Sequence, residues 1–415
     1  MSAILVFTRP SRCLAHPAVL YLLFHVYVVT LRGWAILSGS ETFLGIGMDA
    51  VARAVIVADV FLVSATLGWL LAENRRPVTL DSPARVAVVE RATVRRIGLF
   101  AVPIGLISLV TYGFVPGVAQ GDTVVTTSYQ TVAILWPALI LIALIYVRGF
   151  KPTLLVLLAT FLAVMALQGH SRFRFAIPLI MLLLIYLWQR GRRWPPLRLW
   201  VPVLILMALF VPLKAIGSQV RSGDASWESI RGSVEESTSE VVRGDNPEQA
   251  LLDQAAISIS LADEKALTFH GRPYLAVLTL PVPRPLWPNK PGLANHLQDL
   301  ESPAYPIAEI GAITTVAGDL YINFRWVGVI VGGLALAFVT GNLFRTAMAT
   351  SERSAYFFGY CLLAGAIVQI ARDGLTSVFV FTVVNATPWV LIWYLSIRQQ
   401  RIRERRSNVR VRRYA

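Results

Sequence analysis

The sequence predicts an all-α polytopic membrane protein with about ten transmembrane helices and one large extracytoplasmic loop. Of its 415 residues, 55% are hydrophobic and only 15% are charged, and the mean hydropathy is +0.60. A soluble domain carries about 25% charged residues. Apolar runs of nearly membrane-spanning length recur along the chain, and basic residues gather between them. The net charge of +14 therefore reflects membrane topology, and we expect no nucleic-acid partner.

Ten apolar runs come near the length of about 20 residues that a spanning helix needs. Lipid cannot satisfy backbone N–H and C=O groups, so each run is expected to be helical. The runs are 17–38, 51–72, 97–117, 130–147, 153–169, 175–189, 199–216, 326–344, 355–371 and 375–397. They divide the chain into helices one to seven (1–216), a large outer loop (217–325), helices eight to ten (326–397) and a basic tail (398–415).

The direction of the helices follows from lysine and arginine, which stay in cytoplasmic connections. Of the 38 basic residues, 24 lie at the two termini and in every second connection, while the first two outer connections, 39–50 and 118–129, contain none. This pattern predicts that both termini are cytoplasmic. The tail is interpreted as an orientation signal, with a contact to lipid headgroups or to a partner as the alternative.

The outer loop changes character along its length. Its first half, through WESIRGSVEESTSEVV to ISISLADEKAL, predicts one or two solvated amphipathic helices. From Glu264 to Asp299 no acidic residue intervenes, which suits an anionic ligand. The basic residues of this window are Lys265, His270, Arg272, Arg284, Lys290 and His296. The alternative is a proline-rich loop on the membrane, with snorkelling arginines and Trp287 at the interface.

A second group of basic residues lies between helices five and six, where QGHSRFRFAIP predicts a tight outer turn with Arg172 and Arg174. Both flanking runs are shorter than the hydrocarbon core of about 30 Å requires. The arginines are therefore expected below the outer surface, where ionisable groups are functional candidates. The alternative is a structural ion pair with Asp373 or Asp319.

Further polar residues enter helix eight and end helix nine, at the same predicted side of the membrane. Arginines disfavoured on this side by the positive-inside rule still converge there from three places. The residues in question are Asp319, Tyr321, Asn323, Arg325, Arg372 and Asp373. Near helices one and two, Arg32, Arg53 and Asp59 are interpreted as a candidate structural pair.

This residue set favours a lipid-linked diphosphate as the ligand. The chain has no P-loop, GxGxxG turn, HExxH, CxxC or Asp-x-Asp, so neither a metal nor a cofactor is expected. Arginine binds diphosphate oxygens in pairs and would stabilise charge on a departing diphosphate. The base for the acceptor hydroxyl is left open among His270, His296, Glu309, Asp319 and Asp373. Candidates for stacking on sugar rings are Tyr274, Trp287, Tyr305 and Tyr321.

The motifs QGHSRFRF, PVPRPLWPNKPG and GDLYINFRWVGVI, in this order around a large outer loop, resemble the bacterial O-antigen polymerases, the oligosaccharide repeat-unit polymerases. The resemblance covers the whole length in topology and is most specific over about 270–330 and the arginine turn. It implies a metal-independent, GT-C-like glycosyltransferase in the cytoplasmic (inner) membrane that joins repeat units carried on undecaprenyl diphosphate. A chain-length regulator is a further implied partner, besides the lipid bilayer.

By this resemblance Arg172, Arg174 and Arg284 handle the diphosphate, and Arg272 and Lys290 assist. His270 and Asp319 complete the expected catalytic set. The other expected substrate-binding residues are Tyr274, Trp287, Tyr321, Asn323 and Arg372. The sequence departs from the family pattern at Phe324-Arg325-Trp326, where a small residue, usually glycine, is expected after Asn323.

Two other functions remain open from the sequence. An O-antigen ligase shares the topology and uses a loop histidine, a role that His270 or His296 could take. A polysaccharide flippase or exporter would place ionisable residues along a path through the midplane. Helices three to seven are nearly free of such residues, which favours the polymerase.

Overall fold

The computed structural model describes residues 13–75, 87–113, 133–167, 173–197, 251–279, 314–350, 353–375 and 384–414, with short pieces at 216, 226–232, 234–235, 286–287, 299–300 and 305. In these ranges the regular structure is helical and no strand occurs; one isolated bridge joins Val88 to Ser354.

The helices of the first half begin with a continuous stretch that contains a π-helical turn, η1. In chain order they are α2 (Pro17–His25), η1 (Val26–Thr30), α3 (Leu31–Leu37), the short η2 (Phe43–Gly45), α4 (Met48–Glu73), α6 (Arg91–Gly113), α8 (Trp136–Arg148), α9 (Pro152–Leu167) and α10 (Phe173–Gln189). The second half contains α13 (Leu251–Glu264), α14 (Arg272–Leu278), α17 (Thr315–Met348), α18 (Ala355–Asp373) and α20 (Val384–Tyr414).

Within the described residues, five helices are long and apolar enough to cross a membrane: Pro17–Leu37, Met48–Glu73, Arg91–Thr111, Thr315–Met348 and Ala355–Asp373. Three shorter apolar helices, α8, α9 and α10, accompany them. These eight coincide with the predicted spans one to six, eight and nine. Most of the tenth falls on α20, whereas the seventh, 199–216, lies outside the described residues except for its last position. The apolar helices indicate an all-α, membrane-embedded protein.

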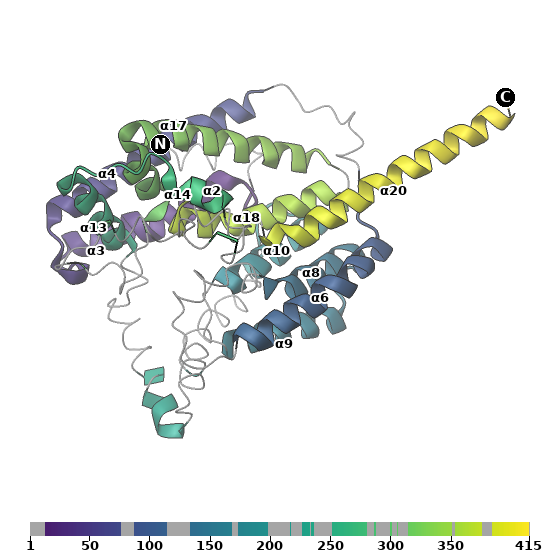
Figure 1. Cartoon of the computed structure of the whole chain (residues 1–415), viewed down its shortest axis with the longest axis horizontal. Helices are drawn as coiled ribbons and strands as arrows, with labels where there is room; N and C mark the ends of the chain where they lie inside the picture. The colour runs from purple at the N-terminus through teal and green to yellow at the C-terminus, as the bar shows by residue number, and fades with distance from the viewer. Residues whose placement is uncertain are drawn as a thin grey trace.

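The helices form one bundle whose two ends differ in charge. In Figure 1, α4 and α17 lie along one side, α6, α8 and α9 along the other, and α20 projects beyond the bundle. One end collects short connections joined by backbone hydrogen bonds, such as Leu14 N to Arg193 O and Val89 N to Arg353 O. Arg403 pairs with Glu90 here at 2.7 Å. We call this the basic end; its basic residues include Arg75, Arg148, Lys151, Arg190, Arg192, Arg193, Arg345, Arg353 and Arg398.

Helix directions follow from the contacts at the two ends. Gly341 of α17 packs on Ala72 near the end of α4, and Gly333 packs on Phe61 nearer the middle, so these two helices run parallel. α18 runs the opposite way, because Gly374 at its C-terminus meets Asp319 near the start of α17. These directions match the alternation expected for spans two, eight and nine.

Small residues let α4 and α17 approach closely. On α17, Gly333, Ala337 and Gly341 recur every four residues, which places them on one face. A Cβ atom on Gly68 of α4 would overlap the Leu334 carbonyl oxygen and lie 2.9 Å from the Ala337 Cβ. Small residues at this spacing are typical of tight packing between membrane helices.

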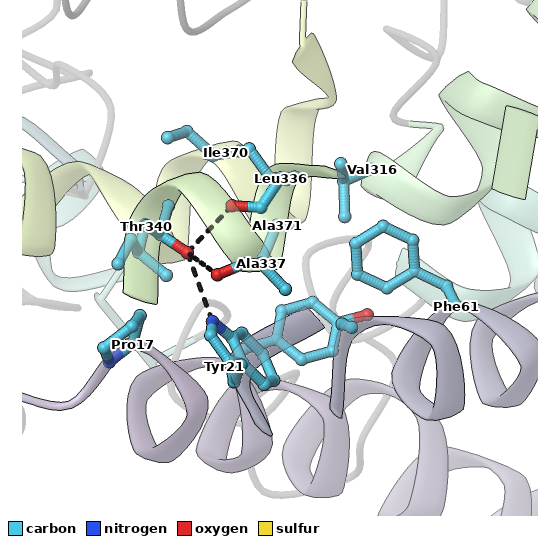
Figure 2. A pocket seen from close by; sticks show the side chains of 12 residues that line it. Pro17, Tyr21, Phe61, Val316, Leu336, Ala337, Thr340, Ile370 and Ala371 are labelled. Atoms are coloured by element: carbon cyan, nitrogen blue, oxygen red, sulfur yellow. Dashed lines mark hydrogen bonds between the residues drawn. The ribbon is translucent and has the colours of Figure 1, made fainter. Parts of the chain in front are cut away.

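An apolar cavity of ≈ 30 Å³ remains between α2, α4, α17 and α18. Figure 2 shows the rings of Tyr21 and Phe61 on its wall and the hydroxyl of Thr340 bonded to the Leu336 and Ala337 carbonyls. The same hydroxyl accepts a hydrogen bond from Trp69 Nε1 at 3.1 Å. The Thr340 hydroxyl on the cavity wall is thus bonded on both its donor and its acceptor side.

Two predictions about the outer loop were wrong. α13 is not a solvated amphipathic helix: Leu251 to Ile259 are buried and pack against α4, α17 and η1. In addition, α17 begins at Thr315 rather than at residue 326, so Asp319, Tyr321 and Asn323 form its first turns. Burial against other helices stabilises both segments, and local hydropathy does not report such contacts.

Candidate functional site

Most of the described site residues gather at the end of the bundle opposite the basic end. Three segments meet there: residues 265–278 with α14, the first turns of α17, and the C-terminus of α18. α13 and the start of α4 complete this end. Segments far apart in the chain thus form one polar region.

A break in α17 provides the hydrogen-bond acceptors that hold residues 269–271. Arg325 has φ 56° and ψ −151°, which interrupts the helix and frees carbonyl groups of the preceding turn. Phe269 N donates to Ile322 O at 3.2 Å and His270 N to Asn323 O at 3.0 Å. Gly271 N donates to Asn323 Oδ1 at 3.2 Å, so the loop is held by both backbone and side chain of α17.

Asp319 is the buried centre of this region, with 2% of its surface exposed. Its Oδ2 accepts hydrogen bonds from Tyr274 Oη at 3.1 Å and from Leu375 N at 2.8 Å, and its Oδ1 accepts one from Asn323 Nδ2 at 3.0 Å. Burial and the neighbouring carboxylate raise the pKa of Tyr274, so its phenol stays protonated and donates. Asp319 thereby joins α14, α17 and α18.

A second carboxylate, Asp263 at the end of α13, binds two arginines. Arg325 pairs with Asp263 and also donates to the Ala262 and Leu267 carbonyls, at 3.0 and 2.6 Å. Arg53 of α4 reaches Asp263 at 3.1 Å. The Tyr321 hydroxyl donates to the same carboxylate at 3.1 Å, so the buried Tyr321 ring faces α13.

The third carboxylate is Asp253, which is 0% exposed. Arg32 binds both of its oxygens, at 3.1 and 2.7 Å, and Phe43 N donates to it at 2.7 Å. The sequence suggested a pair among Arg32, Arg53 and Asp59, and this was wrong, because α13 supplies the acids for both arginines. Arginines on the predicted outer side, which the positive-inside rule disfavours, were the available signal that partner acids exist.

The remaining predicted residues differ in what surrounds them. His270 and Arg272 are exposed, and neither side chain forms a hydrogen bond or ion pair with a described residue. Arg372 pairs with Asp373 at 3.2 Å, and Trp287 is exposed on a short described piece. Arg174 lies in the first turn of α10, but its side chain is outside the described part. Outside the described residues altogether lie Arg172, Arg284, Lys290, His296 and Glu309.

The arrangement suits the binding of an anion. Among the described residues no three His, Cys, Asp or Glu side chains are grouped so as to hold a metal ion. Every described carboxylate at the three-segment junction is bonded to the protein, whereas Arg272 and His270 face outward from a fixed loop. A guanidinium and an imidazole in this position can bind phosphate oxygens or exchange a proton with a ligand.

No family model matches the chain, and no curated protein or solved structure matches it either. The class of protein that the fold defines is an all-α, membrane-embedded protein with a polar junction at one end of its bundle.

Proposed function

We propose that the protein is a metal-independent glycosyltransferase that polymerises oligosaccharide repeat units carried on undecaprenyl diphosphate. In this proposal it works at the outer face of the cytoplasmic membrane, with both termini in the cytoplasm. The observation that carries the proposal is the loop 269–274, which is anchored on the broken helix α17 and holds Arg272 and His270 outward at the end of the bundle away from the basic end.

The proposed chemistry follows from this geometry. The diphosphate of one lipid-linked chain would bind Arg272 together with Arg172, Arg174, Arg284 and Lys290. When the acceptor hydroxyl attacks the anomeric carbon, the bond to the diphosphate oxygen breaks and the lipid diphosphate leaves with the bonding electrons. Guanidinium groups stabilise this developing charge. His270 is the described residue best placed to accept the proton of the acceptor hydroxyl, because its imidazole is exposed.

Asp319, Asn323 and Tyr274 act in this proposal as positioning residues. Asp319 is buried and fully bonded to protein groups, so it holds the loop on α17 rather than meeting a sugar. The Asn323 amide bonds both Asp319 and Gly271 N, which relates the position of the loop directly to the carboxylate. Tyr321 and Arg372 are bonded to Asp263 and Asp373, and they support the same junction.

The test uses purified full-length protein in lipid nanodiscs with a lipid-diphosphate repeat unit and a metal chelator. His270→Ala and Arg272→Ala are expected to insert and unfold like the unmodified protein and to lower chain extension at least tenfold. The matched control is Arg231→Ala, since Arg231 is exposed and its ion pair among the described residues is with Glu235, one helical turn away. Normal chain length from both variants, together with normal extension by Arg172→Ala, Arg174→Ala and Arg284→Ala, would refute the proposed mechanism.

A ligase-type transferase is the second candidate, because an exposed loop histidine such as His270 also suits transfer of a finished chain to a lipid acceptor. Complementation separates the two functions. Loss of a polymerase leaves products with one repeat unit, whereas loss of a ligase leaves long chains that are not attached. Gel electrophoresis of the products also tests for a chain-length regulator as a partner. If such a regulator is present, the distribution of chain lengths changes.

A further inference from the structure

A histidine and an aspartate meet in the interior of two spanning helices, away from the site proposed above. His25 Nε2 lies 3.1 Å from Asp59 Oδ1. Asp59 is about 16 Å from the start of α4 and about 21 Å from its end, at 1.5 Å per residue. His25 likewise lies in the middle part of Pro17–Leu37. The pair is therefore near the midplane of the membrane.

The surroundings of the pair are apolar and leave both residues incompletely bonded. His25 is 4% exposed, and its Nδ1 has no hydrogen-bond partner. The Asp59 side chain is 58% exposed, in a stripe of α4 with Ile56, Val63 and Leu67. Within the described part of the chain, His25 is the only residue bonded to Asp59.

Other charged groups on the packed elements do not neutralise the pair. The Tyr21 phenol faces it from α2, with ring centroids of Tyr21 and His25 6.1 Å apart. From α3 and α4, Arg32 and Arg53 are bound to acids of α13 at the end of the bundle. On α17 and α18, the acidic and basic side chains lie at the junction or at the basic end.

The free-energy cost of a net charge inside the membrane restricts the number of protons that the pair can hold. An unpaired charge near the bilayer centre is costly, because the hydrocarbon core cannot solvate it. A neutral imidazole beside a carboxylate leaves a net charge of −1, and an imidazolium beside a carboxylic acid leaves +1. A single proton makes the pair neutral, whether it resides on the imidazole or on the carboxyl group.

We propose that His25 and Asp59 form an intramembrane proton-binding site that holds one proton at neutral pH. The ligand is a proton, and the site is distinct from the proposed glycosyl-transfer site. The π-helical turn η1 begins directly after His25, and its widened geometry is seen in the bond from Leu31 N to Val26 O. Single π-helical turns inside α-helices occur frequently at functional sites.

The experiment observes the proton directly in the full-length protein in nanodiscs at pH 7. Infrared difference spectra between the unmodified protein and Asp59→Asn report whether Asp59 is a carboxylic acid or a carboxylate. Nitrogen-15 NMR of labelled histidine, with His25 assigned through His25→Gln, reports whether its ring is neutral or an imidazolium. A carboxylic acid beside a neutral ring, or a carboxylate beside an imidazolium, supports the proposal.

A carboxylate beside a neutral imidazole would overturn it, because the pair would then hold no proton. The matched control is Asp263→Asn, since Asp263 pairs with Arg53 and Arg325 and must give a carboxylate signal. Asp59→Asn keeps the shape of the side chain and the neutrality of the site, so we expect it to fold. Chain extension does not enter this test, so its outcome is independent of the proposed function.

Discussion

Arg325 has a backbone conformation that residues other than glycine rarely adopt. A φ of 56° with ψ of −151° costs about 1–3 kcal/mol for such a residue. The guanidinium compensates through Asp263, the Thr268 hydroxyl at 3.0 Å and two carbonyl groups at the end of α13. The sequence departs from the resembled family in this same segment, Phe324-Arg325-Trp326, where a small residue, usually glycine, is expected. Here an arginine keeps the break in α17 and adds a bond to α13.

We expect Arg325→Ala to destabilise the protein more than Arg325→Gly does. Both variants lose the charged hydrogen bonds, worth about 1.5–3 kcal/mol each, but glycine relieves the backbone strain. Thermal unfolding in detergent micelles measures the difference, which we expect to be about 1 kcal/mol or more. Equal unfolding temperatures for the two variants would contradict strain at this position.

Gly374 and Gly149 form a matched pair of helix ends. Gly374 has φ 82° and ψ −178°, and Gly149 has φ 80° and ψ 177°. A Cβ atom on Gly374 would lie 2.7 Å from Asp319 Oδ2, whereas one on Gly149 would meet nothing within 4 Å. The two positions therefore have the same backbone requirement and differ in their neighbours.

Alanine at Gly374 is expected to cost more stability than alanine at Gly149, by about 1–3 kcal/mol. Both variants acquire the same backbone strain, so the excess measures displacement of Asp319 and loss of its bond to Leu375 N. Unfolding curves of both variants give this excess, and the extension assay shows whether the displaced Asp319 also lowers activity. An excess near zero would mean that the junction adapts to the methyl group.

At the scale of elements, the pairing of α4 with α17 depends on a close approach of their backbones. Gly68 faces the Leu334 carbonyl oxygen, and Gly333 and Gly341 face Phe61, Ser64 and Ala72. The sequence contains the signal in GGLALAFVTG, where small residues recur every four positions. Hydropathy alone predicted the two spans but not that they are neighbours.

Gly68→Ala is expected to destabilise the protein by about 1–3 kcal/mol, because the added methyl group meets backbone that cannot rotate away. The control is Gly33→Ala in α3, where a Cβ atom meets nothing within 4 Å. There alanine is expected to stabilise the helix by about 0.5–1 kcal/mol. Opposite shifts in unfolding temperature support the close approach of α4 and α17, and shifts of the same sign would contradict it.

α13 shows why the outer loop was only partly predictable. Its Asp253 and Asp263, with the neighbouring glutamate, gave the segment the charge of a solvated helix. Arg32 and Arg53 neutralise these aspartates, and the remaining apolar residues are buried. From composition alone, these aspartates are expected at a solvated surface. In the structure they are bonded to arginine and belong to the interior.

At the scale of the whole molecule, the two ends of the bundle differ in where their arginines lie and in whether these are paired with acids. At the basic end most arginines lie in short connections between helices. At the opposite end Arg32, Arg53, Arg325 and Arg372 are each paired with an aspartate, whereas Arg272 pairs with no described residue. Pairing removes the net charge that would favour the cytoplasm, which is consistent with an outer location for this end.

Cysteine labelling measures the orientation. A membrane-impermeant maleimide is expected to label Leu275→Cys in intact cells and Leu197→Cys only after permeabilisation; both side chains are exposed, at opposite ends. Background labelling should be low, because Cys361 is buried and burial raises the pKa of the half-buried Cys13 thiol. Labelling of Leu197→Cys in intact cells would reverse the proposed topology.

The sequence by itself determined where the described apolar helices lie and predicted how their directions alternate, because hydropathy and the distribution of arginine are local properties. Only the tertiary structure decided that α13 is buried, that α17 breaks at Arg325, and which acid each arginine binds. The bond between Arg32 and Asp253, for example, joins residues 221 positions apart. Such pairs depend on which helices pack together. The close packing of small residues that brings two helices together depends on the surfaces of both, so one segment of sequence does not reveal it.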